Sequence, residues 1–387
     1  MNKKRLCILL YSLGSGGAER IVSILLESLK NECEITLILL EDICHYEIPQ
    51  NIKKVILGQN SINESGILKL LKIPLLAFKL RQIIKNYDIS LSLMTRPNYI
   101  NILAGILCKN LKNRPKILIS ERSYPSLQYG YKNLNSKINR FLIKALYNKA
   151  DKISANSPDN LNDLIKNFGV DSTKTTLLLN LFDLEKIRAL SKEDSALKDR
   201  ILSAKGQGKF IFFSIGRLDV GKNHSLLIKA MSKFKDKAEL FIIGDGELKA
   251  TLEAEINALG LKNCVHLVGR LKNPFSPLSV SDCFLFASNH EGFPNVLVES
   301  LALGILAIST DCAPKEILAS YKNLDNSQNK LAKGGILVPL NSLKEMQEAM
   351  GFIIKNPRFF DKEIIFKQAQ KFSLTSQLHT YKEWIFR

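Results

Sequence analysis

Two positively charged side chains follow an apolar run in the middle of the sequence. Residues 210–215 predict a strand, which is followed by Gly216 and Arg217 and, five positions further on, by Lys222. Glycine permits a tight turn, and open α/β sheets bind ligands where their strands end. Two fixed positive charges there could hold a nucleotide diphosphate, although a strand-to-helix turn with two solvated cations is the alternative for this segment alone.

Two glutamates lie eight positions apart after another predicted strand, residues 283–287. Gly292 and Pro294 place Glu291 in a loop, and a helical pattern from Asn295 places Glu299 about one turn inside a helix. If the whole interval were helical, the carboxylates would be roughly 12 Å apart. We therefore expect them to contact separate parts of one extended ligand, such as a ribose diol and a sugar hydroxyl. The alternative is a first-turn acid with a second glutamate on an exposed face.

Further polar groups follow the neighbouring strands. At the expected helix start, the backbone N–H groups of Phe293, Asn295 and Val296 could bind a phosphate or sugar oxygen. Turn glycines and a cation follow two more predicted strands, so four strand ends carry such groups on one edge, which is typical of a nucleotide cleft. The candidate nucleotide-binding residues are Gly216, Arg217, Lys222, Gly244, Gly269, Arg270, Phe293, Pro294, Asn295 and Glu299.

A glycine-rich segment follows the first predicted strand, with glycines at Gly14, Gly16 and Gly17. It does not fit the dinucleotide-binding fingerprint, because the third glycine of that pattern would fall on Glu19. We interpret it as a phosphate or acceptor loop that faces the second domain.

Metal ligands and cofactor motifs are not evident in the sequence. There is no Asp-x-Asp pair, and the five histidines have no ligand spacing. Two cations can stabilise a leaving diphosphate where an acidic pair would hold a metal. We expect no bound metal and no cofactor.

Strands that alternate with helices must position these groups. The predicted strands are 6–11, 34–40, 89–94, 116–120 and 152–156, followed by 210–215, 239–243, 265–268, 283–287 and 306–309. This alternation predicts two α/β domains with parallel sheets. The expected boundaries are an N-terminal domain at 1–183, a charged linker at 184–209, a nucleotide-binding domain at 210–361, and a helical segment at 362–387 that could pack back across the junction.

Composition limits the partners and the compartment. The 387-residue chain has a formal net charge of +18, which favours an anionic partner: nucleic acid, an anionic membrane or phosphorylated small molecules. Seven cysteines without a C-x-x-C pair indicate a reducing, cytoplasmic compartment. The basic, apolar start resembles a signal peptide but is better explained as a buried first strand. No apolar run is long enough to predict a transmembrane helix.

The ordered set of motifs resembles glycosyltransferase family 4 over nearly the whole chain. It comprises residues 16–20 (Gly-Gly-Ala-Glu-Arg), Gly216-Arg217 with Lys222, and Glu291 with Glu299. The resemblance implies a GT-B fold, with two Rossmann-like domains and an interdomain cleft, and sugar transfer with retention of anomeric configuration. It also implies catalytic roles for Glu291, Arg217 and Lys222: the cations would hold the donor diphosphate, Glu299 the ribose, and Glu291 the donor sugar.

A narrower likeness concerns the substrates. Residues 11–20, 96–99 and 216–224 look like the N-acetylgalactosaminyltransferases that extend undecaprenyl-diphosphate-linked glycans in bacterial Pgl N-glycosylation, above all the enzyme that makes the second such addition. This implies transfer of N-acetylgalactosamine from UDP-GalNAc in α linkage to a polyprenyl-diphosphate-linked glycan. Another UDP-sugar, used in lipooligosaccharide or capsule assembly, is the alternative.

Arg122 departs from the family pattern. Many members have a histidine that contacts the donor sugar at this point, whereas here the segment reads Ser120-Glu121-Arg122-Ser123. Either Arg122 contacts the acceptor diphosphate or a sugar, or the two segments do not correspond. With Arg96, Gly14, Gly16 and Gly17 it completes the predicted acceptor-binding set.

A basic amphipathic stretch, residues 66–85, could lie on an anionic inner-membrane surface. Its cations are Lys69, Lys72, Lys79, Arg81 and Lys85, and a second helix at 135–149 carries a basic stripe. For each helix alone, a buried domain helix with solvated lysines is the commoner explanation. Together with a polyprenyl acceptor they favour a peripheral protein on the cytoplasmic face of the inner membrane.

Two other classes of function compete with a glycosyltransferase. A nucleotide-sugar epimerase or a phosphorylase could use the same two-domain plan, but an epimerase would form no glycosidic product. A basic nucleic-acid-binding or membrane-binding protein would ignore UDP, and no nucleic-acid-reading motif is present.

Overall fold

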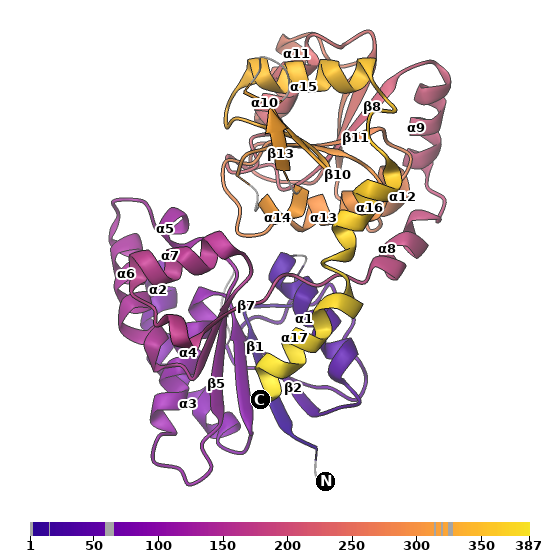
Figure 1. Ribbon diagram of the computed structural model, residues 1–387. Helices are drawn as coiled ribbons and strands as arrows, with labels where there is room; N and C mark the ends of the chain where they lie inside the picture. The colour runs from indigo at the N-terminus through magenta and orange to yellow at the C-terminus, as the bar shows by residue number, and fades with distance from the viewer. Residues whose placement is uncertain (1–2, 15, 59–65, 313–314, 319, 324–327) are drawn as a thin grey trace. The chain divides into compact units, whose positions relative to one another are not determined.

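The computed structural model describes residues 3–14, 16–58, 66–312, 315–318, 320–323 and 328–387 (Figure 1). The chain forms two compact units, one of Met1–Phe182 with Gln377–Arg387 and the other of Asp183–Ser376. Each unit is an α/β domain with its own sheet.

The first unit contains a seven-stranded sheet in the order β3-β2-β1-β4-β5-β6-β7, and every pair is parallel. The strands are β1 Arg5–Leu10, β2 Glu34–Leu39, β3 Lys53–Ile56, β4 Ile89–Leu93, β5 Lys116–Glu121, β6 Lys152–Ala155 and β7 Thr175–Leu177. The helices are α1 Gly17–Leu29, α2 Gly66–Leu71, α3 Ile73–Ile84, α4 Thr95–Leu107, α5 Pro125–Gln128, α6 Leu134–Leu146 and α7 Pro158–Phe168.

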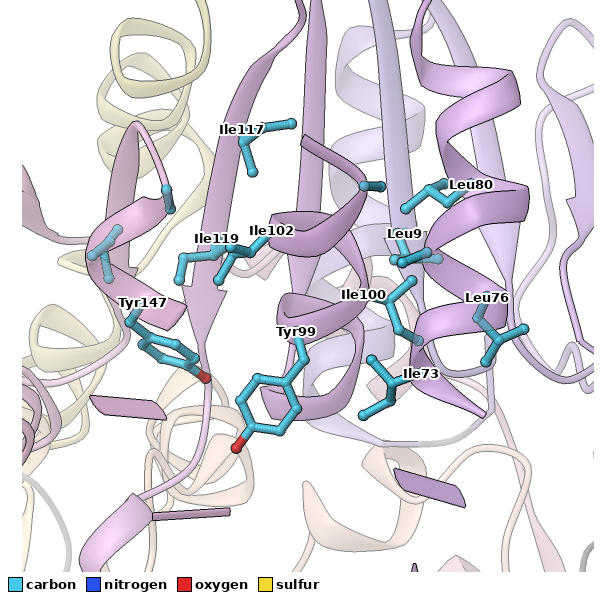
Figure 2. Close-up of a cluster of buried hydrophobic side chains, with 14 of the residues drawn as sticks. Leu9, Ile73, Leu76, Leu80, Tyr99, Ile100, Ile102, Ile117, Ile119 and Tyr147 are labelled. Carbon is cyan, nitrogen blue, oxygen red and sulfur yellow. The ribbon is translucent and has the colours of Figure 1, made fainter. Parts of the chain in front are cut away.

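The core of this unit lies between the sheet and its covering helices. The central strands are continuously apolar or small because both faces are buried, as is typical of parallel sheets. Figure 2 shows Leu9 and Ile119 of the sheet packed with side chains of α3 and α4, including Leu80 and Ile102. Gly105 lets α4 approach β5, since a Cβ there would lie 2.4 Å from Cγ1 of Ile117.

The second unit contains an eight-stranded sheet in the order β10-β9-β8-β11-β12-β15-β14-β13, with β13 and β14 antiparallel to their neighbours. Its strands are β8 Phe210–Ile215, β9 Ala238–Ile243, β10 Val265–Gly269, β11 Cys283–Phe286, β12 Ala307–Thr310, β13 Ser320–Asn323, β14 Lys330–Ala332 and β15 Gly335–Val338. The helices are α8 Leu184–Ser191, α9 Ala196–Gly206, α10 His224–Met231, α11 Lys249–Ala258, α12 Phe275–Leu278, α13 Asn295–Ala302, α14 Lys315–Leu318, α15 Leu343–Lys355 and α16 Lys362–Gln370.

Residues 184–209 differ from the linker that their composition predicts. They form α8 and α9, and both helices belong to the second unit. Polar residues 192–195 separate the two helices, and the side chain of Ser195 caps α9 by accepting the backbone N–H of Lys198. Lys205 on α9 also pairs with Asp282 at 2.7 Å, which fixes this helix beside β11.

The predicted terminal helix is divided into α16 and α17, Leu374–Phe386, and the chain from Gln377 onward groups with the first unit. Three lysine ammonium groups donate to carbonyls at the end of α17: Lys4 to Phe386, Lys116 to Arg387 and Lys152 to Trp384. These cations satisfy carbonyls that a helix terminus leaves without partners, and they favour the negative end of the helix dipole.

Candidate functional site

The loop after β8 carries the two predicted diphosphate-binding cations. The Arg217 guanidinium lies largely in solvent, with 77% of the side chain exposed, and forms an ion pair with Asp219 at 3.1 Å. Lys222 is more sheltered, with 22% exposed. The loop therefore exposes the long side chain of Arg217 to solvent and holds Lys222 closer to the sheet edge.

Lys222 and Glu291 lie in direct contact. The Lys222 Nζ donates to Oε1 of Glu291, and the glutamate side chain is only 15% exposed. The same ammonium lies 5.5 Å from the centroid of the Phe286 ring at the end of β11. The sequence predicts that these residues serve one ligand, and the fold brings them together because β8 and β11 are adjacent parallel strands.

Glu299 lies in the second turn of α13 and is 3% exposed. This burial excludes the alternative that Glu299 is a solvated glutamate on an outer face. The ring of Phe293, just before the helix, packs edge-on against Phe372 with centroids 5.4 Å apart. Phe293 thus helps to fix the start of α13, while its role in binding a ligand stays a prediction.

The glycines after β9 have a packing role. A Cβ on Gly244, which has φ +148°, would lie 1.9 Å from the Gly216 carbonyl oxygen, and one on Gly246 would lie 2.5 Å from that of Leu218. Only glycine therefore lets the β8 loop lie against the β9 loop. Ligand contact by Gly244 is untested, but its effect on the position of Gly216 follows from this geometry.

Gly269 and Arg270 lie further from the centre of the site. Gly269 is the last residue of β10 and Arg270 follows it. Strand β10 is an edge strand two places from β8, and Arg270 is exposed. The close cluster at this sheet edge is therefore formed by the loops of β8 and β11. Gly269 and Arg270 could reach only a more distant part of an extended ligand.

His224 is a buried residue behind the β8 loop. Its side chain is almost fully buried, and its Nε2 lies 3.3 Å from the position that a Cβ on Gly216 would occupy. Burial, followed by repulsion from Lys222, lowers the pKa of His224 to about 4. The ring is therefore neutral near pH 7, and the positive charge beside the diphosphate loop comes from Arg217 and Lys222.

In the first unit, the glycine-rich segment joins β1 to α1. Gly16 is the N-cap of α1, and a Cβ there would lie 2.2 Å from a carboxylate oxygen of Glu19. Burial raises the pKa of Glu19, and a hydrogen bond to its own backbone acts in the opposite direction. Gly14 and Gly17 flank this turn, and Ser15 lies outside the described residues.

Lys69 differs from its prediction as a membrane-surface residue. Its Nζ donates to the Tyr11 hydroxyl at 2.9 Å, and that hydroxyl donates to Glu41 at 2.7 Å. The Lys69 ammonium and the Arg96 guanidinium each lie 5.5 Å from the Tyr11 ring centroid. Lys69 therefore belongs with Arg96 at the carboxyl edge of β1 and β4, because α2 turns this one cation inward.

Arg122 is held within the first unit. Its guanidinium donates to the Leu178 carbonyl at 3.3 Å and to the Tyr381 hydroxyl at 3.0 Å, and Tyr381 donates to the Leu179 carbonyl. These contacts connect the β5 loop with α17. They give Arg122 a structural role that the sequence did not indicate, and its contact with an acceptor remains a prediction.

Glu121 forms the centre of a buried polar network that sequence patterns did not reveal. It is fully buried and accepts hydrogen bonds from Tyr147 at 2.5 Å, Thr95 at 3.0 Å and the Ser123 hydroxyl at 2.8 Å. Its other donors are the backbone N–H groups of the two residues after it. Glu121 thus fixes the β5 loop and the start of α4, which carry Arg122 and Arg96.

Large apolar side chains are exposed along α2 and α3. These helices are separated at Lys72, and Pro74 is the second residue of α3. Leu71, at 71%, is the most exposed, followed by Leu75, Phe78, Leu68 and Ile67. Lys79 on α3 and Lys85, directly after α3, are exposed, whereas Arg81 also donates to the Leu107 carbonyl. Within the described residues, no helix is both long and apolar enough to cross a membrane.

The chain matches two family descriptions that together span most of its length. Residues 15–186 match Glycosyltransferase Family 4, and residues 197–372 match Glycosyl transferases group 1. The Anabaena protein HepE, solved with UDP and glucose, is similar in fold, with a TM-score of 0.76 and 18% identity over 99% of each chain.

Two curated relatives come from Campylobacter jejuni. The chain is 43% identical to N-acetylgalactosamine-N,N'-diacetylbacillosaminyl-diphospho-undecaprenol 4-alpha-N-acetylgalactosaminyltransferase over 310 residues, which cover 80% of this chain and 81% of the relative. It is 26% identical to GalNAc-alpha-(1->4)-GalNAc-alpha-(1->3)-diNAcBac-PP-undecaprenol alpha-1,4-N-acetyl-D-galactosaminyltransferase, over 98% of this chain and 97% of the relative. Both resemblances inferred from the motifs are thereby confirmed, and the chain is a glycosyltransferase of family 4 with the GT-B fold.

Proposed function

We propose that the protein transfers N-acetylgalactosamine from UDP-GalNAc, in α linkage with retention, to an undecaprenyl-diphosphate-linked oligosaccharide in N-glycan assembly. The contact between Lys222 and Glu291 carries the proposal, because it brings a diphosphate-binding cation and a sugar-binding carboxylate to one sheet edge. The 43% identical relative supports the choice of donor and acceptor.

The chemical roles follow from charge and position. Departure of UDP develops negative charge on the diphosphate, which Lys222 and Arg217 can stabilise at the β8 loop. The carboxylate of Glu291, fixed beside Lys222, would orient the sugar whose bond to the diphosphate breaks. Glu299, which is buried in the second turn of α13, would accept hydrogen bonds from the ribose hydroxyls.

We further propose that this transfer needs no metal ion and no cofactor. In this proposal, the positive charges of Arg217 and Lys222 neutralise the diphosphate in place of a metal ion. Activity is therefore expected to survive EDTA. Loss of activity in EDTA, with recovery on addition of magnesium or manganese, would contradict the two-cation explanation.

The acceptor is proposed to bind in the first unit, at the carboxyl edge that carries Gly14, Gly16, Gly17, Arg96 and Arg122. The exposed apolar side chains of α2 and α3 and the cations Lys72, Lys79, Arg81 and Lys85 would place this unit on the cytoplasmic face of the anionic inner membrane. A lipid-linked acceptor could then reach the enzyme without leaving the bilayer.

Product analysis tests the proposed reaction. Purified protein is incubated with UDP-GalNAc, UDP-GlcNAc, UDP-galactose or UDP-glucose and a short-chain polyprenyl-diphosphate disaccharide, and products are identified by mass spectrometry. We expect efficient extension only with UDP-GalNAc. Preference for another UDP-sugar would favour the alternative in lipooligosaccharide or capsule assembly, and conversion of the UDP-sugar without glycosidic product would indicate an epimerase.

A further inference from the structure

Three asparagines connect loops at the carboxyl edge of the second sheet. Asn223 follows Lys222 in the β8 loop, Asn289 precedes Glu291 in the β11 loop, and Asn341 lies between β15 and α15. The Asn223 Nδ2 donates to Oδ1 of Asn341 at 2.9 Å and to Oδ1 of Asn289 at 3.3 Å. We call these three residues the asparagine network.

Asn289 forms hydrogen bonds across the two loops that carry Lys222 and Glu291. Its backbone N–H donates to the Gly221 carbonyl at 2.8 Å, and its Nδ2 donates to the Val220 carbonyl at 3.0 Å. With the bond from Asn223, three hydrogen bonds join Asn289 to the four residues 220–223.

Backbone conformation points to the same residues. Three non-glycine residues of the described chain have positive φ, and two of them are Asn223 at 50° and Asn341 at 56°. Asparagine tolerates this left-handed region better than most residues, but the conformation still has a cost and persists where the surroundings require it. The hydrogen bond between the side chains of Asn223 and Asn341 therefore helps to maintain this conformation in the β8 loop and in the loop between β15 and α15.

We infer that Asn289 is a positioning residue for the donor site, acting with Asn223 to fix Lys222 relative to Glu291. The inference rests on the proposed function, in which these two side chains bind the diphosphate and the sugar. Lysine has a flexible stem, so the position of its ammonium depends on how firmly the loop at its backbone is held. Misplacement of a binding group by about 1 Å can lower a rate by about 100-fold.

Substitution of Asn289 separates positioning from folding. Asn289→Ala removes two side-chain hydrogen bonds and leaves the backbone N–H, so the dissociation constant for UDP should rise about tenfold. Asn223→Gly, which permits the same positive φ, should weaken UDP binding to a similar extent. Asn356→Ala is the matched control, since Asn356 also donates to one backbone carbonyl but lies at the far end of α15.

A double-mutant cycle with Lys222→Ala identifies the route of the effect. UDP affinity is measured by calorimetry for the wild type, both single variants and the double variant, and folding is checked by thermal melting. If Asn289 acts through Lys222, adding Asn289→Ala to Lys222→Ala should change the UDP dissociation constant less than about twofold. Unchanged UDP affinity in both Asn289→Ala and Asn223→Gly, or a full tenfold loss in the Lys222→Ala background, would overturn the inference. Failure of the wild type to bind UDP would instead overturn the proposed function and, with it, this role of Asn289.

Discussion

The carboxyl edges of the two sheets are built in different ways. In the second unit the two cations lie on the loop after β8, where Lys222 pairs with Glu291 and Arg217 extends into solvent. In the first unit the corresponding edge depends on the buried Glu121, which receives hydrogen bonds from three surrounding segments. Charged residues in surface loops can therefore be altered with little effect on folding, whereas Glu121 links binding residues to stability.

The largest effect is expected from the cations of the second unit. Lys222→Ala and Arg217→Ala should each remove about 2 to 4 kcal/mol of transition-state stabilisation, because less positive charge then faces the departing diphosphate. Steady-state kinetics with UDP-GalNAc should show turnover that is lower by roughly 30- to 1000-fold. Near-normal turnover in both folded variants would remove the basis for assigning the diphosphate to this loop.

Glu121→Gln should lower the stability of the first unit and leave UDP affinity unchanged. The amide keeps one acceptor oxygen but presents an NH2 group to donors that now lack a partner, which should cost about 2 to 4 kcal/mol of folding free energy. Differential scanning calorimetry should show a lower melting temperature for the first unit, and UDP titration should show unchanged affinity. Equal stability of the variant and the wild type would mean that the network contributes little to the edge that it surrounds.

Charge reversal on the first unit tests membrane contact. Lys72, Lys79 and Lys85 are changed together to Glu, and Lys69 is kept because it donates to Tyr11. Each cation contributes about 1 kcal/mol at an anionic surface. Loss of all three should therefore lower the affinity for anionic vesicles, measured by cosedimentation, by roughly 100-fold. Turnover on a short-chain, water-soluble acceptor should stay near the wild-type value.

The matched control reverses Lys233, Lys235 and Lys262, which are exposed on the second unit. It has the same net charge as the first variant and should retain vesicle binding. Added salt should weaken binding of the wild type, because the attraction is screened over roughly 10 Å at 0.1 M ionic strength. Equal loss in both triple variants would indicate a general effect of net charge and would argue against a membrane-binding surface on α2 and α3.

The smallest expected difference separates the two glutamates. Glu299→Gln should chiefly weaken UDP binding, by about tenfold, because we propose that this buried carboxylate contacts the ribose. Glu291→Gln should chiefly lower turnover, because we propose that this carboxylate orients the reacting sugar. Calorimetry and initial rates on the same preparations distinguish the two variants, and identical losses of UDP affinity would contradict the division of roles.

Sequence patterns predicted the central strands because these are buried on both faces and read as apolar runs. They did not predict β3 or β7, which are short strands at the outer edges of the first sheet, nor β13 to β15. The composition of residues 184–209 predicts a linker because the polar residues between α8 and α9, including the N-cap Ser195, are also typical of loops. The signal for a boundary was thus the signal for a helix start.

The candidate site was predictable where its chemistry depends on charged residues in short motifs, as for Lys222 and Glu291. The contacts of Lys69, Arg122 and Asn289 depend on which loops the fold brings together, and single residues carry no signal of that. Asn289 stands two positions before Glu291 in the sequence, yet its partners are about 70 positions earlier. The roles of such side chains can be inferred only from the hydrogen bonds that they donate in the folded structure.

The stereochemistry of the product tests the central claim most directly. UDP-GalNAc and a short-chain polyprenyl-diphosphate disaccharide acceptor are incubated with the enzyme in EDTA. The anomeric configuration of the new linkage is assigned by NMR, and the released UDP is quantified. The proposed reaction predicts one α-linked N-acetylgalactosamine for each UDP released. A β-linked product, or release of UDP without a new glycosidic bond, would contradict it.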